Sequence, residues 1–331
     1  MQWYGGSLPS AVDGVVRRVR RGGEPSHVGY VLRPALLRDL DTALREHRPD
    51  VVHLFGWGTA GLVERVGGVP AVHDTVDPWA ANLSNRSVGL MHRLLDAGEL
   101  DRVRQHESRC YPQLARVLVR TDEDAAELQQ QVPAAPVAVV LQGVDAGPEP
   151  LRREGSPTLA FLGAYDATSN VDAAAELVER VLPLVRQHHP DVRAALLGRD
   201  PTKRLRGLAG PQVTVPGYLP DVRSALASAT VFVASMRSGR GVKNKVLEAM
   251  AAGLPVVATR LALNGIGTSV GVVAADTADE QAAAVLHWLA DPEARETAGR
   301  ANRECVLTRH TWAASAAVVE AIWADACTST S

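Results

Sequence analysis

The chain has 331 residues, of which 46% are apolar and 22% charged, and its net charge is −2 because 35 basic residues nearly balance 37 acidic ones. These values are ordinary for a globular protein and exclude a collagen-like fibre, a coiled coil and a largely disordered chain. They also argue against a nucleic-acid-binding protein, which needs a strongly basic surface. At roughly 150 residues per domain, the length predicts two domains.

The number of cysteines and the length of the apolar runs indicate the cellular compartment in which the protein works. Cys110, Cys305 and Cys327 are too few and too scattered for a disulfide scaffold or a zinc cluster. No apolar run is long enough for a transmembrane helix, and residues 1–10 lack the pattern of a signal peptide. We therefore expect a cytoplasmic protein.

Short apolar runs alternate with amphipathic stretches in the first half of the chain, which predicts a parallel sheet covered by helices. We expect strands over 51–55, 71–73, 116–119 and 137–141, and helices over 34–47, 89–110 and 122–131. Thr121 and Asp122 are suitable caps for the last of these helices. The elements form an N-terminal domain over residues 1–145.

The alternation stops where prolines and glycines gather, and we assign 146–157 as a linker. A second domain follows over 158–310, with strands over 158–162, 193–197, 213–215, 230–233 and 255–258, and helices over 171–188, 221–228, 242–252 and 278–289. Residues 293–326 are expected to be helical, with Trp312 and Trp323 as apolar anchors. The end of the chain, 311–331, would pack back toward the first domain. Two doubly wound domains would face each other across a cleft, and ligands bind outside the carboxyl ends of such strands.

The most informative segment is a glycine loop that leads into a helix near residue 242. Gly239 and Gly241 allow a backbone to approach a ligand closely, and the helix N-terminus offers unpaired N–H groups to an anion. Arg237, Lys243 and Lys245 add positive charge where the helix dipole disfavours it. Two of the chain's three lysines lie here. The segment is either an anion site or a solvated cap with incidental charges.

Glu248 lies farther along the same helix. A carboxylate beside a phosphate site can accept hydrogen bonds from both hydroxyls of a ribose. The alternative is a surface glutamate paired with Lys245 or Arg237.

The segment from Arg237 resembles the donor-site signature of retaining glycosyltransferase family four, which has the GT-B fold. It is most similar to bacterial polysaccharide sugar transferases with the pattern Arg-x-Gly-x-Gly-x-Lys-Asn-Lys-x-Leu-Glu-Ala-Met-Ala. Further segments that fit lie at 49–53, 73–77, 142–145, 161–163 with 170–174, and 217–222.

The resemblance implies roles for particular residues. Arg237 and Lys243 would hold the donor diphosphate, Glu248 the ribose, and the turn at Gly217 the base, while His73 would face the transferred sugar. The implied donor-site residues are Gly163, Asn170, Gly217, Tyr218, Leu219, Arg237, Gly239, Arg240, Gly241, Lys243, Asn244, Lys245, Leu247 and Glu248. The implied catalytic residues are His73, Asp74, Asp77, Arg237 and Lys243.

Two departures from the family pattern are visible. Family members often carry a second glutamate eight positions before the first, where this chain has Arg240. The first 33 residues lack a clear apolar strand and glycine-rich loop, because the pair Gly5-Gly6 is too weak a signal. We therefore expect an N-terminal domain that is either reduced or cut by the start of the sequence.

Several weaker features allow two interpretations. Asp74 and Asp77 are either a carboxylate pair for acid–base chemistry or caps of the following turn. The adjacent histidines His188 and His189 have no third metal ligand nearby in the sequence, so a metal site is not expected. A basic run is either a solvated face or a peripheral contact with anionic lipid headgroups; its members are Arg17, Arg18, Arg20 and Arg21.

The resulting prediction is a metal-independent glycosyltransferase of GT-B fold without a cofactor. It would move a sugar from a nucleotide diphosphate sugar to a hydroxyl of a polysaccharide, a glycolipid or a secondary metabolite, with retention. One alternative is a catalytically weak nucleotide-binding subunit that supports a partner transferase. Another is a GT-B sugar-nucleotide epimerase or hydrolase.

Overall fold

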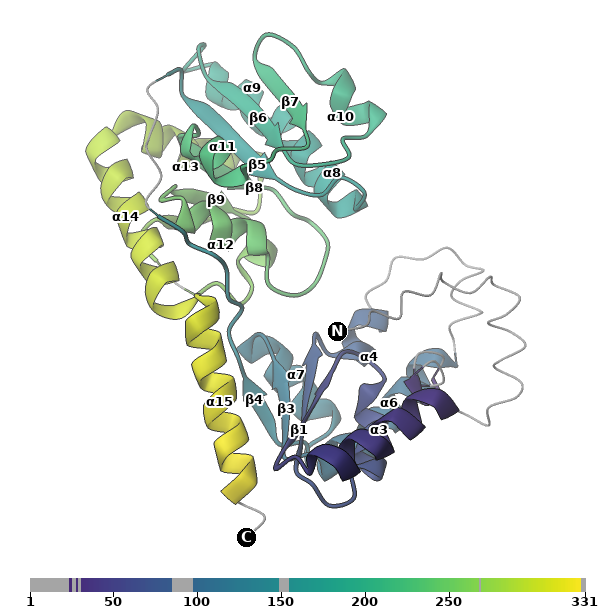
Figure 1. The fold of residues 1–331 in the computed structure, drawn as a ribbon. Helices are drawn as coiled ribbons and strands as arrows, with labels where there is room; N and C mark the ends of the chain where they lie inside the picture. Colours follow the sequence, from purple (N-terminus) through teal and green to yellow (C-terminus); the bar gives the residue numbers. More distant parts are fainter. Residues whose placement is uncertain are drawn as a thin grey trace. The chain divides into compact units, whose positions relative to one another are not determined.

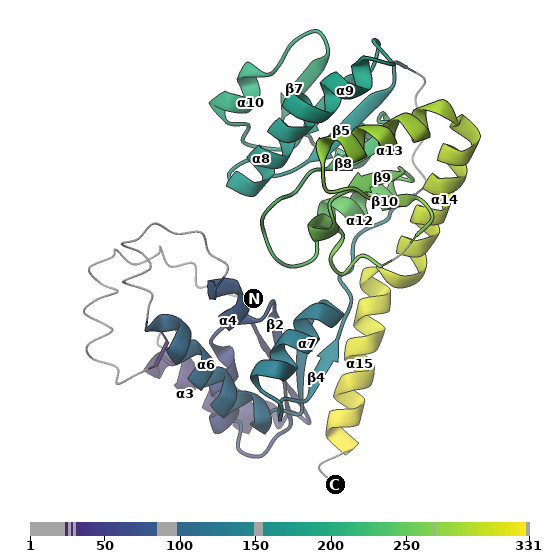
Figure 2. The same cartoon turned by 180° about the vertical axis from the view of Figure 1, so that it is seen from behind.

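The computed structural model describes residues 24–25, 28, 31–84, 98–148, 155–267 and 269–328. It divides into two compact units, shown from two sides in Figures 1 and 2. Unit 1 comprises Met1–Val140 and Val319–Ser331, and unit 2 comprises Leu141–Val318. The basic run at 17–21, the pair Gly5-Gly6 and the start of the helix expected at 89–110 lie outside the described residues.

Unit 1 contains a parallel sheet whose described strands follow one another in chain order, β1-β2-β3-β4. The strands are β1 (Val52–Phe55), β2 (Ala71–Val76), β3 (Arg116–Val119) and β4 (Val137–Val139). The described helical elements are α3 (Pro34–His47), η1 (Thr59–Arg65), α4 (Trp79–Ser84), α6 (Glu99–Cys110), η2 (Tyr111–Gln113), α7 (Asp122–Gln131) and, from Val319 onward, α15 (Trp312–Thr328). Strand β2 runs three residues beyond its predicted end at residue 73 because polar residues continue its pairing with β3.

Helix α15 covers one face of this sheet. Trp323 and Ala326 pack against Val72, Leu118 and Val140, which are all at most 1% exposed. The indole N–H of Trp323 also donates to Nδ1 of a histidine on β1, at 2.9 Å. Trp323 therefore anchors the helix as predicted.

The prediction that Trp312 also anchors α15 is wrong, because its side chain is 59% exposed. The predicted helical stretch over 293–326 is also divided, because α14 ends at Arg309 and His310 and Thr311 separate it from α15. His310 is fully buried, and its two ring nitrogens lie 3.1 and 3.2 Å from the carbonyl oxygens of Gln142 and Ile266.

Unit 2 contains a six-stranded parallel sheet in the order β10-β9-β8-β5-β6-β7. The strands are β5 (Thr158–Leu162), β6 (Arg193–Leu197), β7 (Val213–Gly217), β8 (Val231–Ala234), β9 (Val256–Ala258) and β10 (Val272–Ala274). The chain runs outward from β5 in one direction and then from β8 in the other, so the sheet is doubly wound with a switch point between these strands. The sequence did not predict β10, which has only three residues and is not fully buried.

Helices cover both faces of this sheet, because successive right-handed crossovers run in opposite directions on the two sides of the switch point. The helical elements are α8 (Thr168–Glu176), a π-helical turn (Leu177–Val181), α9 (Leu182–Arg186), α10 (Lys203–Gly207), α11 (Val222–Ala227), α12 (Asn244–Ala251), η4 (Arg260–Leu263), α13 (Ala278–Ala290) and α14 (Pro292–Arg309). Helix α13 packs against α9, and α12 packs against α14.

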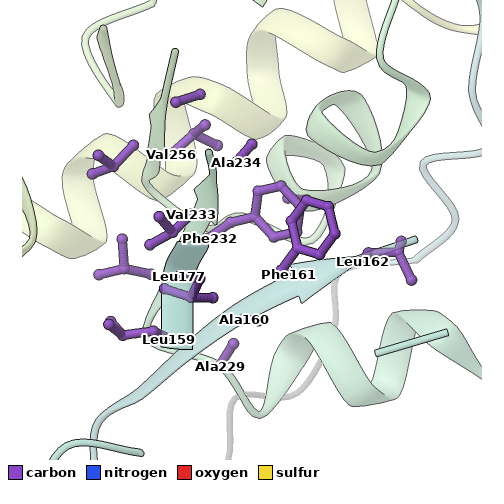
Figure 3. Packing of buried hydrophobic residues seen from close by; sticks show 14 of the residues in the cluster. Leu159, Ala160, Phe161, Leu162, Leu177, Ala229, Phe232, Val233, Ala234 and Val256 are labelled. Carbon is purple, nitrogen blue, oxygen red and sulfur yellow. The ribbon is translucent and has the colours of Figure 1, made fainter. Parts of the chain in front are cut away.

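The core of unit 2 is centred on the adjacent strands β5 and β8 (Figure 3). The rings of Phe161 and Phe232 stack with centroids 6.2 Å apart, and both side chains are fully buried. Leu159, Leu177 and Val233 are likewise fully buried in this cluster. Because β-branched and aromatic residues fill both faces, these strands read as continuous apolar runs in the sequence.

The stacked pair predicts a local loss of stability in the variant Phe232→Ala. We expect the free energy of opening in unit 2 to fall by about 3–5 kcal/mol, because the truncation leaves a cavity. Hydrogen exchange of peptides from β5 and β8 measures it. The control Leu307→Ala, at a position 43% exposed on α14, should change the same quantity by about 0.5 kcal/mol. Equal losses in both variants would contradict this packing.

Candidate functional site

A pocket of about 290 Å³ lies at the carboxyl ends of β5, β6 and β7, where a doubly wound sheet binds ligands. Helix α12, which follows β8, supplies two charged side chains to it. The lining residues are Leu162, Gly163, Ala164, Gly198, Arg199, Tyr218, Leu219, Val222, Lys245 and Glu248. A cation, a carboxylate, an exposed aromatic ring and two glycines therefore share one cavity.

Two glycines allow the strand ends to meet. Gly198 follows β6 with a φ of +127°, and a Cβ atom there would lie 1.9 Å from the carbonyl oxygen of Gly163. A Cβ atom on Gly163 would in turn lie 3.1 Å from Asn170 on α8. The backbone turn after β5 is thus packed between β6 and α8, with no room for a side chain at Gly198 and little at Gly163.

Helix α12 begins at Asn244 rather than at the predicted residue 242, because Lys243 is its N-cap in an extended conformation. Two of the three N–H bonds of the Lys243 ammonium point at its own loop, at 2.7 Å from the carbonyl oxygen of Arg240 and 2.8 Å from that of Gly241. Lys243 is 7% exposed. Its ammonium therefore braces the loop that precedes the helix.

Lys245 and Glu248 are three residues apart, so they share one face of α12. Nζ of Lys245 donates to Oδ1 of Asn170 and lies 5.0 Å from the centroid of the Phe161 ring. Burial and, to a smaller extent, the charge of the nearby Lys243 together lower the pKa of Lys245 to about 8, while the charge of Glu248 opposes the shift. Lys245 is thus a cation held in an unfavourable environment.

Glu248 is half-buried at the pocket wall. Burial raises the pKa of its carboxyl group, and the charge of Lys245 partly offsets this rise. Within the described part of the chain, no hydrogen bond or ion pair engages this carboxylate. The surface interpretation paired Glu248 with Lys245 or Arg237, but Arg237 instead pairs with Glu176 at 2.7 Å.

The structure brings some of the predicted donor-site residues together and places others apart. Gly163, Tyr218, Leu219, Lys245 and Glu248 line the pocket, Asn170 contacts it through Lys245, and Gly217 ends β7 directly before Tyr218. Arg237, Gly239, Arg240, Gly241, Lys243 and Asn244 form the preceding loop and helix start, and they do not line it. Leu247 is fully buried in the core of unit 2, so its side chain has no access to a ligand.

Sequence reasoning missed Arg199 at the pocket rim. Its guanidinium pairs with Asp200 at 2.9 Å and with Asp166 at 3.6 Å. The signal was present, because Gly198 and Arg199 come directly after a buried strand and ligands bind at such strand ends.

In unit 1, His73 lies on β2 and is 1% exposed. Its Nε2 lies 3.2 Å from the carbonyl oxygen of Gly56, which can only accept, so we assign the proton to Nε2. Nδ1 has no partner among the described residues. Burial lowers the pKa of His73 to about 4, so the ring is neutral at physiological pH.

Asp74 and Asp77 flank a strained turn. Asp74 accepts a hydrogen bond from the backbone N–H of Val76 at 3.0 Å and pairs with Arg120. Val76 has a φ of +66°, a conformation that a β-branched residue adopts at a cost of about 1–3 kcal/mol. The carbonyl oxygen of Asp77 accepts from the indole of Trp57 at 2.9 Å. The contact of Asp74 with Val76 is one that the turn-cap interpretation predicts.

Among the described residues, no three His, Cys, Asp or Glu side chains gather closely enough to hold a metal ion. None of the helices that the described residues form combines the length and apolar composition needed to cross a bilayer.

Two family models match the chain. The model described as Glycosyltransferase Family 4 matches residues 2–147, and the model described as Glycosyl transferases group 1 matches residues 156–291. The phosphatidyl-myo-inositol mannosyltransferase of Mycobacterium tuberculosis is 35% identical over 127 residues, which is 36% of this chain and 33% of that protein. The chain thus matches about a third of the length of this curated relative.

Solved structures with low sequence identity share the fold. Sucrose-phosphate synthase from Thermosynechococcus elongatus has a TM-score of 0.67 at 18% identity, covering 88% of this chain and 77% of that one. HepE of Anabaena, in complex with UDP and glucose, has a TM-score of 0.60 at 13% identity, covering 87% and 81%. These likenesses confirm the predicted GT-B fold.

The buried ring of His73 predicts that acid destabilises unit 1. The unfolded chain binds a proton near pH 6.5 and the native state only near pH 4, so this stability is present above pH 6.5 and lost as the pH falls. At pH 5 the loss from His73 is about 2 kcal/mol. Urea unfolding at pH 7.5 and pH 5 measures it.

The variant His73→Gln keeps a donor for the carbonyl of Gly56 and should lose less stability than the wild type between the two pH values. The control His188→Gln, at an exposed position, should keep the full dependence. If His73→Gln shows the same loss of stability between pH 7.5 and pH 5 as the wild type, the loss does not come from His73.

Proposed function

Because this chain belongs to glycosyltransferase family 4, with the GT-B fold, we propose that it moves a sugar from a nucleoside diphosphate sugar to an acceptor hydroxyl. We further propose that the anomeric configuration of the sugar is retained. The observation that carries the proposal is the pocket of unit 2, where the cation of Lys245 and the unpaired carboxylate of Glu248 lie on one helix face.

The pocket offers matching chemistry to each part of a nucleoside diphosphate. Its diphosphate would lie near Lys245 and the start of α12, where Arg237, Lys243 and backbone N–H groups add to the positive potential. Glu248 is about 6 Å along α12 from Asn244, and would accept hydrogen bonds from the ribose hydroxyls. The base would then reach the ends of β6 and β7, at Arg199 and Tyr218.

This arrangement supports departure of the diphosphate without a metal ion. Negative charge develops on the diphosphate as the bond to the sugar breaks, and fixed cations and helix N–H groups stabilise that charge in the transition state. We therefore propose metal-independent transfer. His73, to which the family resemblance gives contact with the transferred sugar, is neutral because its pKa is low, and at 1% exposed it would have to become accessible before it could contact a sugar.

The curated relatives suggest which substrates to test first. Their names specify mannosyl transfer to phosphatidyl-myo-inositol. We propose a hexose donor and a glycolipid acceptor as the first pair, with polysaccharide and small-molecule acceptors next. A glycolipid acceptor would also require peripheral contact with a membrane, for which the basic run at 17–21 is the candidate.

Two measurements test the proposal. Thermal shift against a panel of nucleoside diphosphates identifies the base, since a ligand at a hundredfold excess over its Kd adds about 2.7 kcal/mol of stability. Sugar release is then followed with and without acceptors, with NMR of the product's anomeric configuration. Release only with an acceptor and with retention supports the proposal; release without any acceptor indicates a hydrolase or epimerase. Nucleotide binding with no release in any mixture indicates a supporting subunit.

Glu248 provides a specific prediction. Hydrogen bonds from neutral hydroxyls to a carboxylate are worth about 1.5–3 kcal/mol, so Glu248→Gln should weaken nucleotide binding by about 10- to 150-fold with little change in unfolding. Calorimetry with the best-bound nucleoside diphosphate and its 2′,3′-dideoxy analogue measures this. The analogue should bind the wild type weakly and lose little more in the variant. Simple addition of the two losses would show that Glu248 does not contact the ribose.

Metal dependence gives a second prediction. Turnover should be the same with and without EDTA, because protein cations stabilise the departing diphosphate. Initial rates of sugar transfer, measured after dialysis against the chelator, check this. Loss of activity that Mg²⁺ or Mn²⁺ restores would overturn the metal-independent mechanism while leaving the donor pocket intact.

A further inference from the structure

We propose that Asn170 is a positioning residue: it holds the ammonium of Lys245 at the wall of the pocket as the cation that meets the donor's diphosphate. Lys243, by contrast, braces the glycine loop. The inference rests on the proposed function and assigns separate tasks to two lysines that sequence reasoning placed in one site.

The amide of Asn170 is fixed at both ends. Its Nδ2 donates to the carbonyl oxygen of Ala164 at 2.7 Å, which orients Oδ1 toward Lys245. Gly163 allows this approach, because a Cβ atom there would lie 3.1 Å from the side chain of Asn170. Asn170 is therefore held between the turn after β5 and the start of α12.

Lys245 is held from a second side by Phe161. Its Nζ lies 5.0 Å from the ring centroid, within the range of a cation–π contact, and 3.8 Å from the sulfur of Met236. Neither group carries a charge. In the described part of the chain, no carboxylate forms an ion pair with Lys245, although the charge of Glu248 acts on it from the next turn.

The two lysines differ in where their donors point. Lys243 directs two N–H bonds at carbonyl oxygens of its own loop and does not line the pocket. Lys245 lines the pocket, and its partners are a neutral amide, a thioether and an aromatic face. A diphosphate in the pocket would supply the negative charge that these neutral partners lack.

The charged groups that face Lys245 are few. Lys243 lowers its pKa and Glu248 raises it, while burial is the largest cause of the fall to about 8. At pH 7.5 roughly a quarter of such amines are neutral, against about a thousandth for an ordinary lysine. An amine reagent at limiting concentration should therefore label Lys245 faster than the exposed Lys203.

The chain has only three lysines, so labelling can be read residue by residue. The wild type is treated with a small amine-reactive reagent between pH 6 and 10, with and without inorganic pyrophosphate, and peptides are quantified by mass spectrometry. We expect a midpoint near pH 8 for Lys245 and strong protection of Lys245 by pyrophosphate. Lys203 serves as the internal reference, and its labelling should not respond to pyrophosphate.

Two substitutions at Asn170 separate positioning from a general structural role. Asn170→Ala removes a hydrogen-bond acceptor of the charged amine, so the pH midpoint of Lys245 labelling should move to lower pH. Asn170→Asp places a carboxylate there, so the midpoint should move to higher pH. Midpoints that move in the same direction, or not at all, would overturn the role of Asn170.

Binding completes the test. Lys245→Ala should weaken pyrophosphate binding about 10- to 100-fold, and Lys203→Ala should leave it unchanged. Nucleotides that stabilise the wild type without protecting Lys245 would overturn the inference and leave the proposed function standing. Protection by pyrophosphate with no response to any nucleoside diphosphate would overturn the function and support the inference. The protection measurement needs no variant, so it stands even where a substitution prevents folding.

Discussion

The pocket of unit 2 depends on the close contact between the turn after β5 and the end of β6. At Gly198 a single added carbon would collide with the backbone of Gly163 at 1.9 Å. This contact fixes the end of β5 and the turn that leads into α8. Asn170, near the start of α8, is thereby placed where its Oδ1 accepts a hydrogen bond from Lys245 on α12. Elements separated by up to 82 positions in the sequence are thereby held in one cavity wall. A larger residue at Gly198 would displace backbone, and with it the wall, rather than a single side chain.

Much of unit 2 and its pocket could be predicted from the sequence, because apolar strands and the loop-helix segment carry strong local signals. Helices α3 and α7 and strands β3, β5 and β6 begin and end where expected. The failures have two causes, short length and long-range contacts. Strand β10 has too few residues to show a period, and the division before α15 follows from His310, whose partners at Gln142 and Ile266 are remote in the sequence. The separate placement of Lys243 and Lys245 is decided by contacts that spacing alone does not contain.

Unit 1 shows how burial can change the chemistry expected of a motif. The segment from His73 to Asp77 carries titratable groups that suggest acid–base catalysis. In the fold, His73 is buried against a carbonyl and its pKa is low, and Asp74 is engaged by Arg120 and a backbone N–H. The strained φ of Val76 lies in the middle of this segment. A buried neutral histidine and an aspartate already engaged by Arg120 favour a structural part for this segment over proton transfer.

The covering of the unit 1 sheet by α15 has a consequence for how the protein is made. Residues 319–328 are translated after all of unit 2, yet they bury Val72, Leu118 and Val140 on a sheet synthesised near the start. While a ribosome still holds the end of the chain, that apolar face stays open to water and to other chains. The first unit to emerge is therefore the last to be completed. Its exposed face is where a chaperone would have to act during synthesis.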